Sequence, residues 1–302
     1  MSIIKQYAIP FIALAAIIVA ISACSPQVGI KPPSSGSSLT PLQVLQNSSN
    51  AMKQLKSSHV SLQSSDNLKT TGSSSSPGSS NPQNVTINIT GSGDEALPNQ
   101  EQLKLSINAL NQVTNLTEIV QGNQVYVQNP QGKWYVLNAS QLEGMVGNPF
   151  AGISLDQNTL LGLIQNTQIT DHGTESLNGQ SLRHITAALD KDALRQLLTN
   201  NPQLKGALGT QDIDTLLNNT KSFLSTIDVW IDETHFYVHR TQFKLNLTAN
   251  TGAVSTAAPG TTAVNLNTIV DLSNFNAPVT ITPPTNAIPT DNPGAVFGIG
   301  KP

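Results

Sequence analysis

Hydrophobic and polar residues alternate most clearly in residues 223–247. In the first half of this stretch Ile227, Val229 and Ile231 alternate with polar side chains, and the second half repeats the pattern. A period of two residues is typical of a strand with one buried face. Residues 232–235 supply a turn, so the stretch predicts a long antiparallel hairpin. Its apolar face needs a cover, because a two-stranded ribbon is not stable alone.

The same two-residue period recurs in shorter runs on both sides of this hairpin. Asn178-Gly179 separates two of the runs and is a strong signal for a tight hairpin turn. Most runs follow one another closely, which predicts a meander of consecutive antiparallel strands. The runs are residues 85–90, 103–108, 113–120, 125–127, 134–137, 169–176, 181–188 and 264–272.

Several segments change to the three- and four-residue spacing of helices. Thr40 followed by Pro41 begins one helix, with the hydroxyl as N-cap and proline in the first turn. Asp156, Asp190 and Thr210 are the expected N-caps of three further short helices, each with leucines on one side. Such short helices do not persist alone, so we expect them to pack on the sheet.

The N-terminus has the pattern of an export signal. Lys5 precedes a short apolar run that ends in Ile-Ser-Ala-Cys24, and this predicts a signal peptide over residues 1–23. Ile-Ser-Ala-Cys resembles a bacterial lipobox, which implies diacylation of the Cys24 thiol, for example with palmitate. An ordinary signal with an incidental cysteine is the alternative. Residues 24–39 are rich in Pro, Ser and Gly, as in a flexible tether.

Composition excludes several classes of function. Charged residues make up 11% of the 302 residues and the formal net charge is -3, so we expect no nucleic-acid partner. The single cysteine excludes an internal disulfide. No HExxH or GxSxG motif is present, and Asp171-His172 is more typical of a turn than of a hydrolase triad. His235 and His239 lie too far apart along a strand to share a metal. We therefore expect no enzymatic activity, no cofactor and no metal.

The order of elements resembles the LppX/LprG family of mycobacterial lipoproteins. The resemblance rests on the phrases GNQVYVQNPQGKWYVL, NTLLGLIQN, HGTESLNGQSLRHITAAL, TIDVWIDETHFYVHRTQFKL and LSNFNAPVTITPP. It implies an α+β fold over residues 40–284, similar to the carriers LolA and LolB, followed by a disordered tail over residues 285–302. In that fold a U-shaped antiparallel half-barrel carries short helices on its concave face, with a lipid cavity between them.

The resemblance also implies a function. We expect a monomeric lipoprotein on the outer face of the bacterial cytoplasmic membrane, which binds a lipid or lipidated glycan and carries it within the envelope. A membrane protein is a further candidate partner. The alternative is a surface interaction or envelope-sensing module whose interior is filled. The residues expected to line the cavity are Leu160, Leu163, Ile164, Leu194, Leu197, Leu198, Leu216, Leu217, Ile227, Val229 and Ile231.

Overall fold

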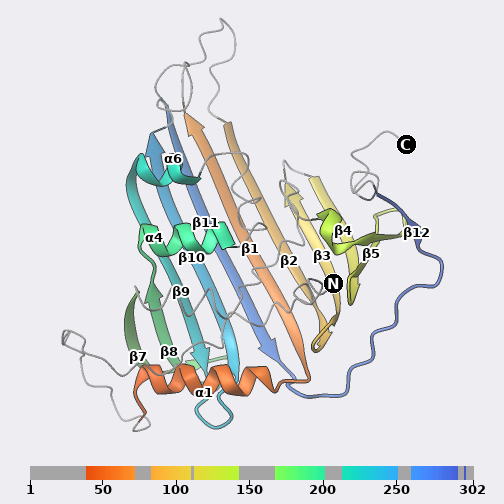
Figure 1. The fold of residues 1–302 in the computed structure, drawn as a ribbon, viewed down its shortest axis with the longest axis horizontal. Coiled ribbons are helices and arrows are strands. Elements are labelled where there is room, and N and C mark those ends of the chain that lie inside the picture. Colours follow the sequence, from red (N-terminus) through yellow and green to blue (C-terminus); the bar gives the residue numbers. More distant parts are fainter. Residues whose placement is uncertain are drawn as a thin grey trace, which may run out of the picture.

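The computed structural model describes residues 39–71, 83–109, 112–142, 167–200, 213–250, 260–291 and 296. These residues form one sheet of 12 strands with short helices beside it (Figure 1). The strands are β1 Ser57–Thr71, β2 Gln83–Ala96, β3 Gln100–Ala109, β4 Gln112–Gln121, β5 Gln124–Gln128, β6 Trp134–Asn138, β7 Gln168–Leu177, β8 Gln180–Ala188, β9 Thr220–Ile231, β10 Val238–Asn250, β11 Thr261–Ser273 and β12 Ile288–Pro289. The described helices are α1 Pro41–Lys53, α2 Ala139–Leu142, α4 Lys191–Asn200 and α6 Ile213–Asn218.

The sheet consists of two meanders joined in the middle. Its order is β12-β6-β5-β4-β3-β2-β1-β11-β10-β9-β8-β7, so consecutive strands pair within each half and β1 pairs with β11 between the halves. The sheet is open and curved, which confirms the predicted α+β half-barrel. All pairs are antiparallel except β12 with β6, which is parallel. Strand β12 lies within residues 285–302, the segment for which the sequence predicts a disordered tail.

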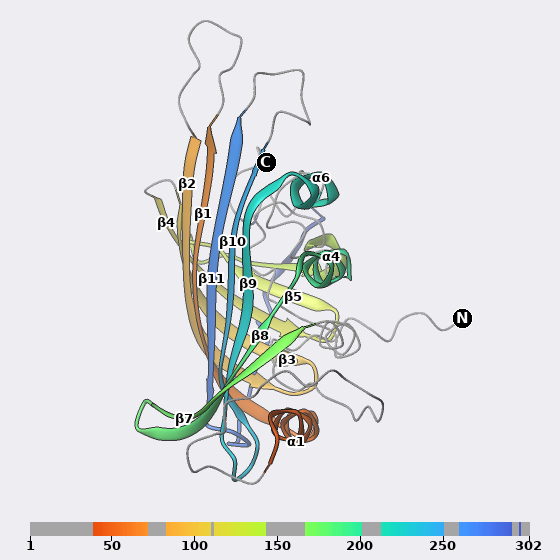
Figure 2. The same cartoon turned by 90° about the vertical axis from the view of Figure 1, so that its left-hand side faces the viewer.

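Two of the predicted N-caps are confirmed, whereas Asp156 and Thr210 lie outside the described residues. Thr40 caps α1 together with Gln43, whose side chain accepts a hydrogen bond from the Thr40 backbone amide at 2.8 Å. The Asp190 carboxylate accepts a hydrogen bond from the backbone amide of Ala193 at 2.7 Å and so caps α4. Helices α1, α4 and α6 all lie on the same side of the sheet (Figure 2). We call this side of the sheet the inner face and the opposite side the outer face.

Two glycines in β2 allow the sheet to bend. A Cβ atom at Gly93 would lie 1.8 Å from the backbone oxygen of Gln102 in β3, and one at Gly91 would lie 2.5 Å from the Leu105 side chain. Strand β3 therefore approaches β2 more closely than any larger residue would permit. Glycine inside a strand commonly marks such a bend. The Gly91-Ser-Gly93 sequence thus has a structural role in curving the sheet.

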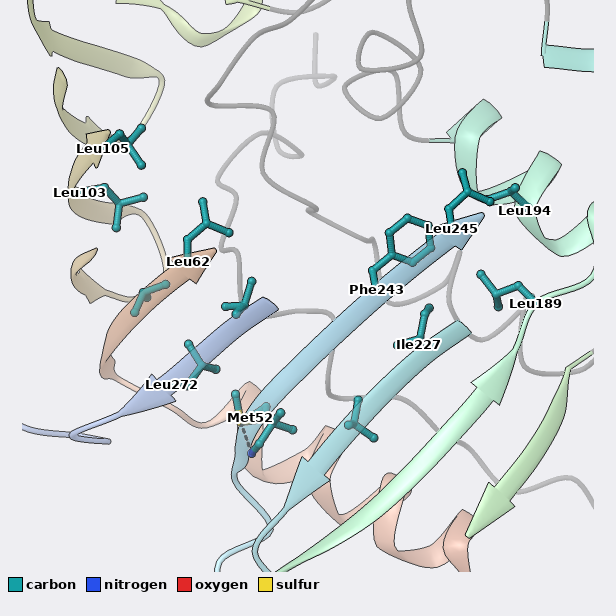
Figure 3. Packing of buried hydrophobic residues seen from close by; sticks show 14 of the residues in the cluster. Met52, Leu62, Leu103, Leu105, Leu189, Leu194, Ile227, Phe243, Leu245 and Leu272 are labelled. Carbon is teal, nitrogen blue, oxygen red and sulfur yellow. Dashed lines mark hydrogen bonds between the residues drawn. The ribbon is translucent and has the colours of Figure 1, made fainter. Parts of the chain in front are cut away.

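A single apolar cluster lies on the inner face and connects the two halves of the sheet. Figure 3 shows side chains of β3, β1, β10 and α4, among them Leu103, Leu62, Phe243 and Leu194, directed toward a common interior. Met52 of α1 belongs to the same cluster. The inner face is thus where apolar surface is removed from water, and this burial stabilises the fold.

Candidate functional site

The long hairpin supplies the centre of the inner face. Ile227, Val229 and Ile231 of β9 are 7%, 5% and 0% exposed, as their alternation predicts. The antiparallel register sets Ile227 opposite Phe243 and Val229 opposite Thr241 in β10, and paired residues share a face. The predicted hairpin is therefore confirmed. Its apolar side points toward the helices.

Helices α4 and α6 add leucines to the same cluster. Leu194 and Leu217 are fully buried and belong to the cluster that contains Ile227, Val229 and Ile231. The structure thus brings together five of the residues predicted to line a cavity. Leu160, Leu163 and Ile164 lie outside the described residues, as does Cys24, and the side chains of Leu197, Leu198 and Leu216 are likewise not described. The role of all these residues in lipid contact stays a prediction.

The inner face extends further than the predicted lining. Strands β3 to β6 contribute a second set of buried apolar side chains, which the sequence-based list of lining residues omitted. These residues alternate with polar residues along their strands, and this alternation is the signal that could have identified them. They are Leu103, Leu105, Leu116, Val125, Val127 and Leu137.

Three buried glutamates interrupt this apolar surface. Glu95 of β2 lies opposite Glu101 of β3, and Glu118 of β4 lies opposite Leu103. Their exposed fractions are only 1%, 6% and 5%. The Ser58 hydroxyl donates a hydrogen bond to Glu95, whereas Glu101 Oε1 has no hydrogen-bond partner in the structure.

Burial controls the charge of these glutamates. Desolvation raises the pKa of Glu95 and of Glu118 to about 8, against an ordinary value of 4.5. Desolvation and the neighbouring carboxyls, Glu118 foremost, raise the pKa of Glu101 well above its usual range. Burial therefore favours the protonated, neutral form of all three carboxyls. The inner face consequently carries polar groups with little net charge.

Sequence reasoning missed these glutamates. Glu101 has the same parity as Leu103 and Leu105, and Glu118 has the same parity as Leu116. An acidic residue at an inward-facing position of a strand is the signal that could have identified them.

The edge of the sheet holds a buried ion pair. Arg183 in β8 donates hydrogen bonds to both carboxylate oxygens of Asp171 in β7, at 2.8 and 2.5 Å. Glu233 lies 3.3 Å from the same guanidinium group. Asp171 is therefore engaged by Arg183, while His172 stacks on His184. Asp171 and His172 thus lie within strand β7, at an irregularity in its pairing with β8, and not in the turn that the sequence favoured.

A separate hollow of about 470 Å³ lies beside α4. The described residues that line it are Asp190, Asp192, Arg195 and Gln196, all charged or polar. Such a surface favours water over an acyl chain.

Within the described part of the chain, no helix has the length and apolar composition needed to cross a bilayer.

Comparison with known proteins identifies the fold family. The model of the LppX_LprAFG lipoprotein family matches residues 40–281. The crystal structure of lipoprotein LppX from Mycobacterium tuberculosis is similar at 19% identity and a TM-score of 0.43, over 79% of this chain and 96% of that one. LprF from Mycobacterium bovis has 19% identity and a TM-score of 0.40, over 80% and 95% of the two chains. No curated protein sequence matches the chain. The family match alone carries the assignment.

Proposed function

Because this chain belongs to the LppX_LprAFG lipoprotein family, we propose that it binds a lipid or acylated glycolipid against its inner face and carries it within the cell envelope. The observation that supports this most strongly is the apolar cluster spanning both halves of an open sheet. The helices beside this open sheet contribute leucines to the same apolar surface, which offers one face to an acyl chain.

The buried glutamates fit such a ligand. Protonated carboxyls both donate and accept hydrogen bonds, so Glu95, Glu101 and Glu118 offer partners to hydroxyl groups of a lipid or glycan. They do so without the repulsion that ionised carboxylates would exert on an apolar chain. Acyl chains would lie over Ile227 and Val229, with polar groups toward β2, β3 and β4.

The energetics favour a carrier over a tight receptor. Moving a 16-carbon chain out of water is worth on the order of 10 kcal/mol, at about 0.8 kcal/mol per CH₂. A lipid that leaves a bilayer is already out of water, so its transfer to an apolar cavity is close to neutral. Small differences in affinity then decide loading and unloading.

The N-terminus supplies the membrane address in this proposal. Acylation of Cys24 would hold the protein on the outer face of the cytoplasmic membrane, since two or three chains anchor durably where one does not. We expect Cys24→Ala to abolish labelling by radioactive palmitate and to reduce partitioning into detergent. Unchanged palmitate labelling would contradict the assignment of Cys24 as the acylated residue.

Native mass spectrometry tests lipid binding. Full-length protein from a lipid-containing host should retain non-covalent acyl species, and Val229→Trp should reduce their occupancy at least several-fold, because the indole fills the space over β9. Val113→Trp is the matched control, since Val113 is 61% exposed on the outer face. Circular dichroism should show that both variants fold. Absence of co-purified lipid from the unmodified protein would favour the interaction module, and equal loading of both variants would place the lipid elsewhere.

A further inference from the structure

Three metal-ligating side chains meet on the outer face, away from the proposed lipid site. His172 occupies the irregular position between Asp171 and Gly173 in β7, His184 lies in β8, and Asp228 lies in β9. One ligand atom from each of the three lies within 4.8 Å of the others. Three adjacent strands therefore bring together residues that are far apart in sequence.

From this arrangement we propose that His172, His184 and Asp228 bind a divalent transition metal ion, with zinc as the expected ion. Two imidazole nitrogens and one carboxylate oxygen are a donor set that suits zinc and its neighbours better than magnesium or calcium. Three protein ligands leave a fourth position for water.

The distances are close to those that zinc requires. Zinc–nitrogen and zinc–oxygen bonds of about 2.0–2.2 Å set the ligand atoms of a tetrahedral site about 3.3–3.5 Å apart. His184 Nε2 and Asp228 Oδ1 already lie 3.1 Å apart. His172 stacks on the His184 ring at 4.3 Å between centroids and must rotate out of that stack. It is exposed, so a change of side-chain rotamer brings its nitrogen to the ion.

The groups around His184 hold its ring in the orientation that a metal ligand needs. His184 stacks on Trp230 with ring centroids 4.2 Å apart and planes at 11°. Glu175 Oε1 lies 3.1 Å from His184 Nδ1, within ion-pair distance although the angle is not that of a hydrogen bond. A small adjustment of this exposed carboxylate would accept the Nδ1 proton. A carboxylate on the far nitrogen of a metal-bound histidine is a common outer-shell arrangement.

The competing interpretation is an ion pair without metal. Protonated His184 would then bridge Asp228 and Glu175, with Lys244 at 3.4 Å from Asp228 and the Thr186 hydroxyl at 2.5 Å as further partners. In that arrangement His184 carries the charge, and His172 contributes only the hydrogen bond between its Nε2 and the Thr186 hydroxyl, at 2.8 Å, which requires no zinc. The two interpretations therefore differ in the effect of changing His172.

Isothermal titration with zinc chloride distinguishes them. We use the full chain with Cys24→Ala, so that no thiol binds zinc, and a purification tag without histidine. One zinc ion per chain should bind, and His172→Ala should weaken its affinity at least tenfold. His184→Ala should weaken the affinity for zinc to a similar extent. If the His184 variant misfolds, the variant at the exposed His172 still tests the site.

His235→Ala is the matched control, because His235 also lies beside an aspartate, at 3.6 Å from Asp232. It should leave zinc affinity unchanged. Absence of stoichiometric binding, or equal affinity of the His172 variant and the unmodified protein, would overturn the proposed site. Loss of binding in the His235 variant alone would do so as well.

Discussion

The most informative single substitution is Glu95→Gln, which replaces a buried acid by a neutral group of the same shape. Glu95 is 1% exposed, and burial raises the pKa of its carboxyl to about 8. In the unfolded chain the same carboxyl titrates near its ordinary value of 4.5. The folded protein therefore holds a proton that the unfolded chain releases between these two values.

The sign and size of the effect follow from proton linkage. Since the folded state binds more protons, the free energy of unfolding falls as pH rises from about 4.5 to about 8 and is then constant. At pH 7 the difference for one such group is about 3 kcal/mol, from about 1.4 kcal/mol per pH unit. Glutamine does not ionise in either state. We therefore expect Glu95→Gln to stabilise the protein at pH 7 by about 1–3 kcal/mol, less whatever the altered contact with Ser58 costs.

Urea denaturation at pH 5, 7 and 8.5 measures this effect. The unmodified protein should lose stability across this range, and the variant should lose less. Asp94→Asn is the control, because Asp94 is its exposed neighbour and its ion pair with His59 contributes little. A variant no more stable than the unmodified protein at pH 8.5 would refute the assignment of Glu95 as a protonated, buried acid. So would an unmodified protein whose stability rises with pH.

Two further substitutions test the frame of the sheet. Gly93→Ala should destabilise the protein by about 3 kcal/mol or more, since the new Cβ collides with the Gln102 backbone oxygen. The midpoint of urea denaturation measures this loss. Ser92→Ala on the outer face is the control, and an equal effect of that substitution would contradict the prediction. Arg183→Ala leaves the Asp171 carboxylate without its guanidinium partner and should lower the free energy of unfolding by about 3 kcal/mol. This is the lower end of the range for a buried ion pair, because the hairpin lies at the edge of the sheet. Thermal unfolding measures that loss, and recovery in the double variant with Asp171→Ala is expected.

Periodicity predicted most of the strands because one side of each is apolar and the other is wet. The long hairpin of β9 and β10 and the caps of α1 and α4 followed from local chemistry alone. The pairing of β1 with β11 could not be predicted in this way. Strand β1 directs Ser64 inward, where its hydroxyl meets Thr268 at 2.8 Å, so the strand lacks a continuous apolar phase.

The candidate site was predictable to the extent that its residues follow strand phase. Ile227, Val229 and Ile231 were identified because their alternation is uninterrupted. The histidines and Asp228 were not identified as a group, because only the register of β7, β8 and β9 brings them together. Register depends on long-range pairing, which a local pattern does not encode.

Photocrosslinking tests the central claim most directly. The full-length protein is incubated with vesicles that contain a phospholipid with a photoactivatable group in its acyl chain, then irradiated, digested and mapped by mass spectrometry. The account predicts adducts on inner-face positions of β9 and β10, such as Val229 and Leu245. Adducts confined to outer-face positions, or none above those on an unrelated soluble protein, would contradict lipid binding by the inner face.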